Sequence, residues 1–510
     1  MSENAKLAGT VISTALDLGV KDFIICAGAR NVPLLADLSE RDGIDLWNHF
    51  DERSAAFFAL GLAKAGKQPA AVVTTSGTAV AELLPAVIEA HYSGIPLILI
   101  TADRPDSFRG SGAPQAIDQF NIFGGYVSQC VDLTPTTSRG ITWDKQSPIH
   151  FNVCFEEPVP EPTCEGPPLQ INIQNTEARE VAIPELKNPI VLVGELDETD
   201  RKDVENWLSQ SKIPAWLEAT SGLRESPRLA DQRIRDESRI REMSPAEVIR
   251  IGGVPSLRFW RDLEKMGHIR VVNFTRTPFP GLARRENVIS SQISALRNLT
   301  GYSHGPNRVQ SSIQQGTVAE KLKRHPRSEP SLVAALSRII TQNAAIFLGN
   351  SLPIREWNLA ADFSIPHRYC FANRGANGID GEVSSFLGVS RDFEESWGIF
   401  GDLTALYDLN APWMMSRLPA GKRRIVVLNN AGGRIFSRLP AMKQLPPATM
   451  AKTENHHNRR FSAWADLWDL EYIRWSDQPE EWSMPNAEHV IIEIKIDQQN
   501  SEAFWNDPAT

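Results

Sequence analysis

Short apolar runs alternate with amphipathic stretches over the first 180 residues of the chain. The segments KDFIICAG, AAVVTTSG, PLILITADRP and LQINIQN are mainly apolar, and each ends in residues typical of turns and caps. Residues 53–66 and 78–92, which lie between such runs, have helical character. Continuously apolar strands that are separated by helices predict a parallel sheet covered on both faces.

The same alternation of strands and helices starts again twice. Residues 183–188, IPELKN, have the composition of a linker, and strands and helices follow them from PIVLVGEL through AEVIRIGGVP and SLRFWRDLEKMG to HIRVVNF. A second connection, RHPRSEP, precedes LVAALSRIITQNAAIFLGNS, and this last series ends in the strand HVIIEIKI and a polar tail. We therefore predict three α/β domains with parallel sheets, formed by residues 1–182, 183–325 and 326–510.

Composition and charge narrow the class of protein. The chain has 510 residues, enough for several hydrophobic cores, and 42% of them are hydrophobic while 23% are charged. The net charge of -9 includes no long run of one sign, so we expect no nucleic-acid partner. No apolar stretch reaches the roughly 18 residues that cross a bilayer, and the start MSENAKLAGT lacks the features of a signal peptide. We expect no membrane span and a cytoplasmic location.

The cysteines do not suggest a metal or a disulfide framework. Cys26, Cys130, Cys154, Cys164 and Cys370 are scattered, and none belongs to a C-x-x-C pair. We expect unreactive, buried thiols.

Candidate ligand-binding residues lie at two predicted strand ends in residues 400–436. One strand ends in Gly401 and Asp402, and the next, RIVVL, ends 25 residues beyond Leu403 in a pair of asparagines. Carboxyl ends of parallel strands meet at one edge of a sheet, so Asp402 and Asn430 could converge there as oxygen ligands for Mg²⁺. Gly432 and Gly433 would let the backbone come close to the metal and to a diphosphate. Each piece alone could also be a plain turn or loop.

The pairing of GD with NN about 25 residues later resembles the cofactor motif of thiamine diphosphate-dependent enzymes. Nearly the whole chain is similar to one branch of that family, the 2-succinyl-5-enolpyruvyl-6-hydroxy-3-cyclohexene-1-carboxylate synthases of menaquinone biosynthesis. FDER, TSGTAVAELLPAVIEA, LITADRP, GNSLPIR, NRGANGIDG and GDLTALYDLNA carry the similarity. It implies the thiamine diphosphate-binding fold, with a pyrimidine domain, a central domain and a diphosphate domain in that order. It also implies a homo-oligomer whose active sites lie between subunits.

The resemblance assigns roles to cofactor residues. Glu52 would hydrogen-bond the aminopyrimidine ring of thiamine diphosphate and favour its imino tautomer, although a carboxylate at a helix start is also favourable by itself. Ile379 would hold the cofactor in its bent shape. Asp402, Asn430 and Gly432 would bind Mg²⁺, or alternatively Mn²⁺, while Gly401 and Gly433 would complete the diphosphate site. Asp51 and Arg53 are expected to make capping or interface contacts.

The same resemblance implies anionic substrates, 2-oxoglutarate as donor and isochorismate as acceptor. Ser351, Arg355 and Arg374 match positions that hold the donor carboxylate, and Gln115 matches a catalytic position beside the reacting intermediate. Three further arginines match positions that bind the acceptor carboxylates: Arg30, Arg104 and Arg258. Forked guanidinium groups suit carboxylates, although any single arginine could instead form a surface salt bridge.

Three departures from the family pattern concern the acceptor side. Ala29 stands where the family generally has Ser, Pro114 where Asn is usual, and Leu257 where a basic residue commonly precedes the arginine. Each change removes a hydrogen-bonding group, worth roughly 0.5–3 kcal/mol. The hypothesis is that 2-oxoglutarate decarboxylation is retained while the acceptor site is altered.

Other functions remain open at this point. A 2-oxo acid decarboxylase or an acetolactate synthase-like carboligase would share Glu52, Asp402 and Asn430 but would not need Arg355 and Arg374. A non-catalytic paralogue would not need Glu52. A dinucleotide-binding protein is disfavoured, because no G-x-G-x-x-G follows a predicted strand with an acidic residue about 20 positions later.

Overall fold

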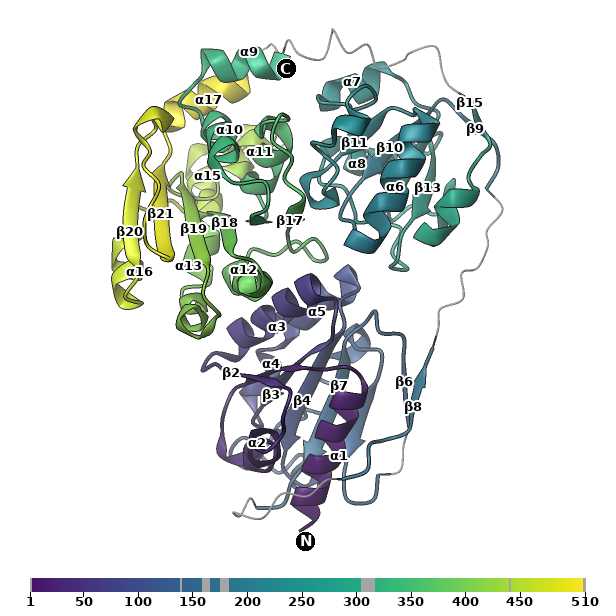
Figure 1. Ribbon diagram of the computed structural model, residues 1–510, viewed down its shortest axis with the longest axis vertical. Helices are drawn as coiled ribbons and strands as arrows, with labels where there is room; N and C mark the ends of the chain where they lie inside the picture. The colour runs from purple at the N-terminus through teal and green to yellow at the C-terminus, as the bar shows by residue number, and fades with distance from the viewer. Residues whose placement is uncertain are drawn as a thin grey trace. The chain divides into compact units, whose positions relative to one another are not determined.

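The computed structural model describes residues 2–137, 140–157, 166–174, 183–303, 317–439 and 442–507. The chain forms two compact units. The first comprises residues 1–176, 375–392 and 407–419, and the second comprises residues 177–374, 393–406 and 420–510. The first unit contains one large sheet and the second contains two (Figure 1).

The first unit is built on a six-stranded, all-parallel sheet. In spatial order its strands are β2 (Asp45–Asn48), β1 (Asp22–Ile25), β3 (Ala70–Thr74), β4 (Leu97–Asp103), β7 (Ile149–Cys154) and β5 (Cys130–Leu133). The helices of this unit are α1 (Glu3–Asp17), α2 (Val32–Ser39), α3 (Glu52–Gly66), α4 (Thr78–Ala81), α5 (Leu84–Ser93) and α12 (Glu382–Val389). Helices α1 and α2 share a core with one face of the sheet, while α3 packs on β1 and β3. The sheet is therefore covered on both faces, as the apolar runs predict.

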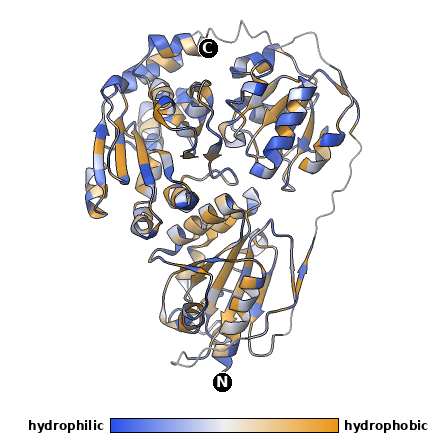
Figure 2. Ribbon diagram, viewed as in Figure 1, coloured by the Kyte–Doolittle hydropathy of each residue, from blue (hydrophilic) through white to orange (hydrophobic). Residues whose placement is uncertain are grey.

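The second unit starts with a five-stranded parallel sheet. In spatial order its strands are β11 (Ala215–Leu217), β10 (Pro189–Val193), β12 (Glu247–Ile251), β13 (Arg270–Phe274) and β14 (Val288–Ser291). The associated helices are α6 (Glu198–Ser211), α7 (Glu237–Glu242) and α8 (Arg258–Asp262). Figure 2 shows the hydrophobic colour concentrated on the strands and more polar colour on outer helices such as α6.

A second six-stranded parallel sheet completes this unit. In spatial order its strands are β17 (Tyr369–Phe371), β16 (Ala345–Leu348), β18 (Glu395–Gly401), β19 (Lys422–Asn429), β21 (His489–Lys495) and β20 (Glu471–Trp475). The helices that accompany it are α9 (Thr317–Arg324), α10 (Glu329–Ile339), α11 (Leu352–Ala360), α13 (Asp402–Tyr407), α14 (Ile435–Arg438), α15 (Pro447–Glu454), α16 (Ser462–Leu467) and α17 (Gln498–Asn506). Its β18 and β19 lie side by side, so the ends that carry Asp402 and Asn430 are adjacent.

Several sequence-based predictions of elements need correction. The segment LQINIQN forms β8 (Ile171–Ile173), which pairs with β6 (Ile141–Trp143) in a separate two-stranded sheet and not in the main one. The predicted linker 183–188 contains β9 (Leu186–Lys187), which pairs with β15 (Tyr302–Ser303). Most of the polar tail is helix α17, whose Phe504 is buried.

Two expectations can be compared with the described residues directly. None of their helices is long and apolar enough to cross a membrane. The four cysteines among them are unpaired, and Cys26, Cys154 and Cys370 are buried. Burial raises the pKa of the Cys130 thiol to about 11 and that of Cys154 to about 12, which fits unreactive thiols. Cys164 lies outside the described residues.

Candidate active site

Glu52 is the first residue of helix α3, and its neighbours fix the start of that helix. The Asp51 carboxylate caps the helix by accepting a hydrogen bond from the Ser54 backbone N–H (3.0 Å), and it also accepts one from Asn410 Nδ2 (2.8 Å). Arg53 donates to the Tyr407 carbonyl and lies over the Tyr407 ring. The side chains of Asp51 and Arg53 thus make capping and packing contacts, as expected. Glu52 lies between them at the start of the helix.

A cavity of about 550 Å³ adjoins the Glu52 carboxylate. Gln115 lines the same cavity, together with residues of the β3–α4 loop. Burial raises the pKa of Glu52 above its usual value, and the nearby carboxylates of Asp51 and Glu82 add to this effect. A half-buried carboxyl group with a raised pKa is suited to sharing a proton with a bound ligand.

Tight backbone packing positions Gln115 in this cavity. Gln115 has a left-handed backbone (φ +58°), and a Cβ on Gly77 would lie 3.3 Å from the Gln115 Cα. Gln119, which is fully buried, accepts a hydrogen bond from the Gly77 N–H (3.2 Å) and donates to the Ala102 carbonyl (2.9 Å) and to Asn152 Oδ1 (2.8 Å). No local feature of the sequence indicates Gln119, because its partners belong to other elements of the fold.

The loop that carries Ile379 belongs to the first unit. Ile379 is half-buried and precedes helix α12 in the sequence. The Glu89 carboxylate holds the start of this loop by accepting hydrogen bonds from the Gly375 and Ala376 N–H groups, both at 2.7 Å. A Cβ on Gly375 would lie 2.5 Å from the Glu89 carbonyl oxygen, so this close approach requires glycine.

In the second unit, Asp402, Asn430 and Gly432 meet at the carboxyl ends of β18 and β19. Asp402 is 2% exposed, and its Oδ2 accepts a hydrogen bond from the Gly432 N–H (3.0 Å). Burial raises the pKa of Asp402, and His457 opposes that shift, with its Nε2 at 3.3 Å from Asp402 Oδ2. Gly432 has φ +141°, and a Cβ there would lie 2.6 Å from the Glu454 carbonyl oxygen. The predicted convergence of these residues is present in the structure.

The Asn430 side-chain amide has a hydrogen-bond partner on its nitrogen side only, among the described residues. Its Nδ2 donates to both oxygens of the buried Glu329 carboxylate, at 2.9 and 3.2 Å, so its Oδ1 points the other way. This Oδ1 is buried and has no hydrogen-bond partner among the described residues. A buried carboxylate beside an unsatisfied amide oxygen fits the ligand preference of Mg²⁺.

Glu329 belongs to a buried charged cluster that the sequence did not suggest. Arg438 donates to Glu356 Oε1 (2.8 Å) and to Glu329 Oε2 (3.2 Å). The cluster fixes the direction of the Asn430 amide.

The two glycines predicted for the diphosphate site differ in the space around them. A Cβ on Gly401 would meet no described atom within 4 Å, and one on Gly433 would lie 3.1 Å from the Phe436 ring.

Arg355 and Arg374 lie close enough to influence one another, beyond the ends of β16 and β17. Burial lowers the pKa of Arg355, and the positive charge of Arg374 lowers it further. Arg374 donates to Asn350 Oδ1 (2.8 Å), and Arg355 donates to the carbonyl of Ser351, a residue with φ +70°. A pair of partly desolvated cations is a favourable place for a carboxylate ligand.

A buried carboxylate from the five-stranded sheet faces these arginines. Glu218, which follows β11 and is 1% exposed, accepts hydrogen bonds from Ser256 N and Oγ (2.5 and 2.6 Å). Burial raises the pKa of Glu218, while Arg374 and Arg355 lower it. Glu218 is not among the site residues predicted from the sequence.

The three arginines predicted for the acceptor all have partners within the chain. Arg30 donates to the carbonyls of Phe155 and Glu156 and to Glu157 Oε2. Arg104 Nε donates to the Pro114 carbonyl (3.1 Å), and Arg258 Nε donates to Asp262 Oδ1 (3.0 Å).

Two of the departures have a clear structural setting. Leu257 is 5% exposed and packs in a core with Ile190 and Trp260, where a cation would be costly. Ala29 opens the short 3-10 helix that carries Arg30.

Comparison with known proteins identifies the family. Residues 6–122 match the family model described as "Thiamine pyrophosphate enzyme, N-terminal TPP binding domain". A 2-succinyl-5-enolpyruvyl-6-hydroxy-3-cyclohexene-1-carboxylate synthase from Bdellovibrio bacteriovorus is 39% identical over 99% of this chain and 98% of its own length. The chain belongs to this synthase family. A synthase of the same name from Akkermansia muciniphila is 38% identical and covers 98% of both chains.

A solved structure shows the same fold at low sequence identity. An X-ray structure from Mycobacterium smegmatis, described as a thiamin diphosphate-dependent enzyme, superposes with a TM-score of 0.66 at 14% identity, over 97% of this chain and 100% of the other. The predicted thiamine diphosphate-binding α/β fold is thereby confirmed.

Proposed function

We propose that this protein decarboxylates 2-oxoglutarate and adds the resulting succinyl unit to isochorismate, with thiamine diphosphate and Mg²⁺ as cofactors. The observation that carries the proposal is the buried, unpartnered Asn430 Oδ1 beside Asp402, in a chain that is similar over its full length to synthases of this name.

Asp402, Asn430 and the Gly432 carbonyl would hold Mg²⁺. The first two offer buried oxygens, and the Gly432 carbonyl accepts from the Arg434 N–H (2.9 Å) and keeps a second lone pair. Mn²⁺ could take the same ligands. Gly401 and Gly433 would line the diphosphate. Ile379 would support the bend between the two rings of thiamine diphosphate.

Glu52 would hold a proton at the cofactor's pyrimidine nitrogen. Thiamine diphosphate supplies, when bound, the electron sink that a 2-oxo acid needs to lose carbon dioxide. The raised pKa of Glu52 suits a carboxyl group that donates to a ring nitrogen, and Gln115 is placed at the same cavity to contact the reacting substrate.

Arg355, Arg374 and Ser351 would bind the distal carboxylate of 2-oxoglutarate. Comparing 2-oxoglutarate with pyruvate as donor tests this role. Clear preference for 2-oxoglutarate supports it, whereas preference for pyruvate favours an acetolactate synthase-like enzyme or a simple decarboxylase. Calorimetric binding of thiamine diphosphate and Mg²⁺ without turnover would instead indicate a non-catalytic paralogue.

An altered acceptor site is the second candidate. Arg30, Arg104 and Arg258 donate to groups of the chain itself, and Ala29, Pro114 and Leu257 lack the polar groups usual in the family. The acceptor would then be a different enoate or related cyclic acid, or isochorismate would bind weakly. Turnover of isochorismate at roughly 1 per second or faster with a micromolar KM would refute this hypothesis.

The remaining predictions rest on the sequence alone. The protein would act as a homo-oligomer with active sites between subunits, in the cytoplasm, with small anions and no nucleic acid as partners. The three domain boundaries, 1–182, 183–325 and 326–510, also remain predictions.

A further inference from the structure

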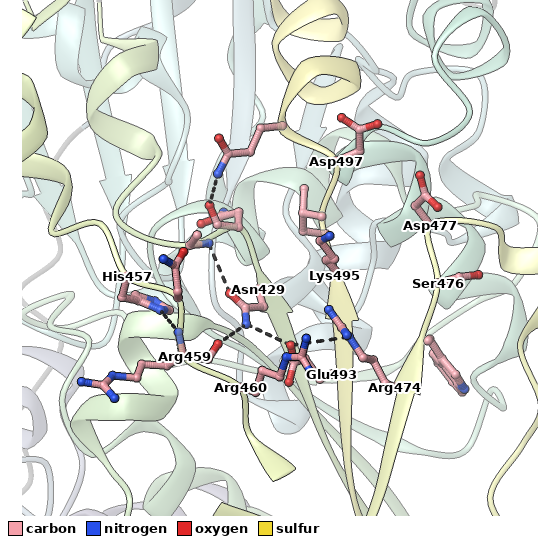
Figure 3. A pocket seen from close by; sticks show the side chains of 16 residues that line it. Asn429, His457, Arg459, Arg460, Arg474, Ser476, Asp477, Glu493, Lys495 and Asp497 are labelled. Atoms are coloured by element: carbon pink, nitrogen blue, oxygen red, sulfur yellow. Dashed lines mark hydrogen bonds and ion pairs between the residues drawn. The ribbon is translucent and has the colours of Figure 1, made fainter. Parts of the chain in front are cut away.

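A basic cavity of about 800 Å³ opens beside the metal-binding edge of the second unit (Figure 3). It lies at the carboxyl ends of three adjacent strands, β19, β21 and β20. Four basic side chains line it: Arg459, Arg460, Arg474 and Lys495. Asn430 and Ala431 also line it, whereas Asp402 and Gly432 do not, so the cavity adjoins the proposed metal site and extends from it toward the edge of the sheet.

Three acidic side chains also line this cavity, Asp477, Glu493 and Asp497, and each has partners within the chain. Asp477 Oδ2 lies 3.9 Å from Arg327 Nε. Glu493 is 1% exposed and accepts hydrogen bonds from Asn429 Nδ2 (3.0 Å), the Phe461 N–H (2.9 Å) and the Tyr472 hydroxyl (2.9 Å). Asp497 caps helix α17 by accepting from two of its N–H groups. These contacts orient the carboxylates but do not remove their charge, so the four basic and three acidic side chains leave the lining with a small positive excess.

The basic side chains are, by contrast, available. Arg459, Arg460 and Lys495 are exposed, and their side chains form no ion pair or hydrogen bond with any residue that the structure describes. Arg474 keeps only a long contact, 4.0 Å from its Nε to Glu493 Oε1. Three unpaired cations on the lining of one concave surface favour an anion with more than one negative charge.

We propose that this cavity is a second anion site, beside the proposed diphosphate site, which binds a compact anion with two or more negative charges through phosphate or carboxylate oxygens. The forked guanidinium groups of Arg459 and Arg460 would grip the anion, and Lys495 would add a point charge from β21. The volume suits a small metabolite and not a polymer.

Hydrogen bonds connect the cavity to the metal-binding loop. Asn429 Nδ2 donates to the Arg459 carbonyl (3.0 Å), and Asn429 Oδ1 accepts from the Ala431 N–H (3.2 Å). The His457 N–H donates to the Ala431 carbonyl (3.3 Å). An anion that orders residues 457–460 would therefore also order residues 429–431. This coupling rests on the proposed function, whereas the anion site itself does not.

Calorimetric titration of the cofactor-free protein without Mg²⁺ tests the site. Citrate and inorganic phosphate are the two probes, and they distinguish a carboxylate from a phosphate ligand. At least one should bind the wild type, and R459Q/R460Q should weaken that binding about tenfold or more. The matched control K202Q/K265Q removes two exposed positive charges elsewhere and should change it less than about twofold. The unfolding temperatures of both variants verify their folding.

Three results would overturn the proposal. The first is that neither probe binds the wild type, and the second is that R459Q/R460Q and K202Q/K265Q bind the probe equally well. The third is that R459Q/R460Q dissociates the oligomer, which would assign the basic side chains to a contact with a second copy of the chain. Glu52→Gln should retain anion binding, so failure of the proposed catalysis is distinguishable from failure of this site. To test the coupling, the Kd for thiamine diphosphate is measured with and without the anion. It should change in the wild type but not in R459Q/R460Q, and an unchanged Kd in the wild type would refute the coupling.

Discussion

At the scale of single residues, the first turn of α3 shows how neighbouring charges divide their work. Asp51 and Arg53 make structural contacts, and Glu52 lines a cavity with a pKa raised mainly by burial. The stability cost of such a carboxylate is characteristic of residues selected for function.

Glu52→Gln should reduce carbon dioxide release from 2-oxoglutarate at least about 100-fold, because the amide cannot move a proton as the carboxyl group does. Steady-state assays of carbon dioxide measure this. Unchanged release would refute the assigned role.

The same substitution should stabilise the cofactor-free protein near neutral pH. The folded pKa of Glu52 lies above its unfolded value, so the favourable protonated state is complete below the unfolded pKa and is lost as the pH rises through the folded pKa. Removing the charge should therefore raise Tm at pH 7 and have little effect at pH 4. A lower Tm at pH 7 would contradict the pKa direction.

Glu329 should act through Asn430. Glu329→Gln weakens the hold on Asn430 Nδ2, so the Mg²⁺-dependent affinity for thiamine diphosphate should fall about tenfold or more. Titration calorimetry measures it, with the exposed Glu320→Gln on α9 as the control. Equal affinities of the two variants would show that Glu329 does not position the ligand.

At the scale of elements, helices α3 and α12 of the first unit pack unusually close together. A Cβ on Gly61 would lie 2.0 Å from the Ser385 carbonyl oxygen, and one on Gly388 would lie 2.2 Å from that of Phe58. The buried Asp408 carboxylate joins the same helices through Ser54 Oγ and the Ser384 N–H, at 3.1 and 2.7 Å. This packing fixes the helix that presents Glu52.

Gly61→Ala should therefore lower the free energy of unfolding by about 1–3 kcal/mol, since overpacking forces the helices apart. Gly66→Ala in the last turn of the same helix is the matched control, because its Cβ would meet only the Arg391 side chain at 3.8 Å. Urea unfolding measures both changes. Equal effects would show that the contact of α3 with α12 is not the cause.

The elements that the sequence predicted best are those with local signals. Apolar runs indicated β1, β3 and β4, and the ends of β18 and β19 indicated Asp402 and Asn430. Strand β7 was not predicted, because His150 and Asn152 interrupt its apolar run. In the fold both side chains are buried, and they bond to Thr101 and Asp132, so the polar residues belong to the core.

Supporting residues of the candidate site lacked any local signal. Glu329 is 101 positions from Asn430, and Glu89 is 286 positions from Gly375. Pairing over such distances depends on tertiary structure, which hydrophobic periodicity does not encode. The resemblance to a known family supplied site residues but not the side chains that hold them.

At the scale of the whole molecule, the proposed active site needs Glu52 of one subunit and Asp402 of another. Glu52→Gln and Asp402→Ala should each be inactive alone. Mixed under conditions of subunit exchange, they should regain up to about a quarter of the wild-type activity, since half of the dimers are mixed and one of their two sites is intact. If the mixture gains no activity although exchange is demonstrated, the sites do not lie between subunits.

The proposed reaction is tested by following carbon dioxide and product together. The protein is incubated with thiamine diphosphate, Mg²⁺, 2-oxoglutarate and isochorismate, and mass spectrometry detects the product. We expect equal amounts of carbon dioxide and of an adduct whose mass is that of both substrates less carbon dioxide, with both absent for Glu52→Gln. Release of carbon dioxide from pyruvate but not from 2-oxoglutarate, or release that Glu52→Gln leaves unchanged, would contradict it.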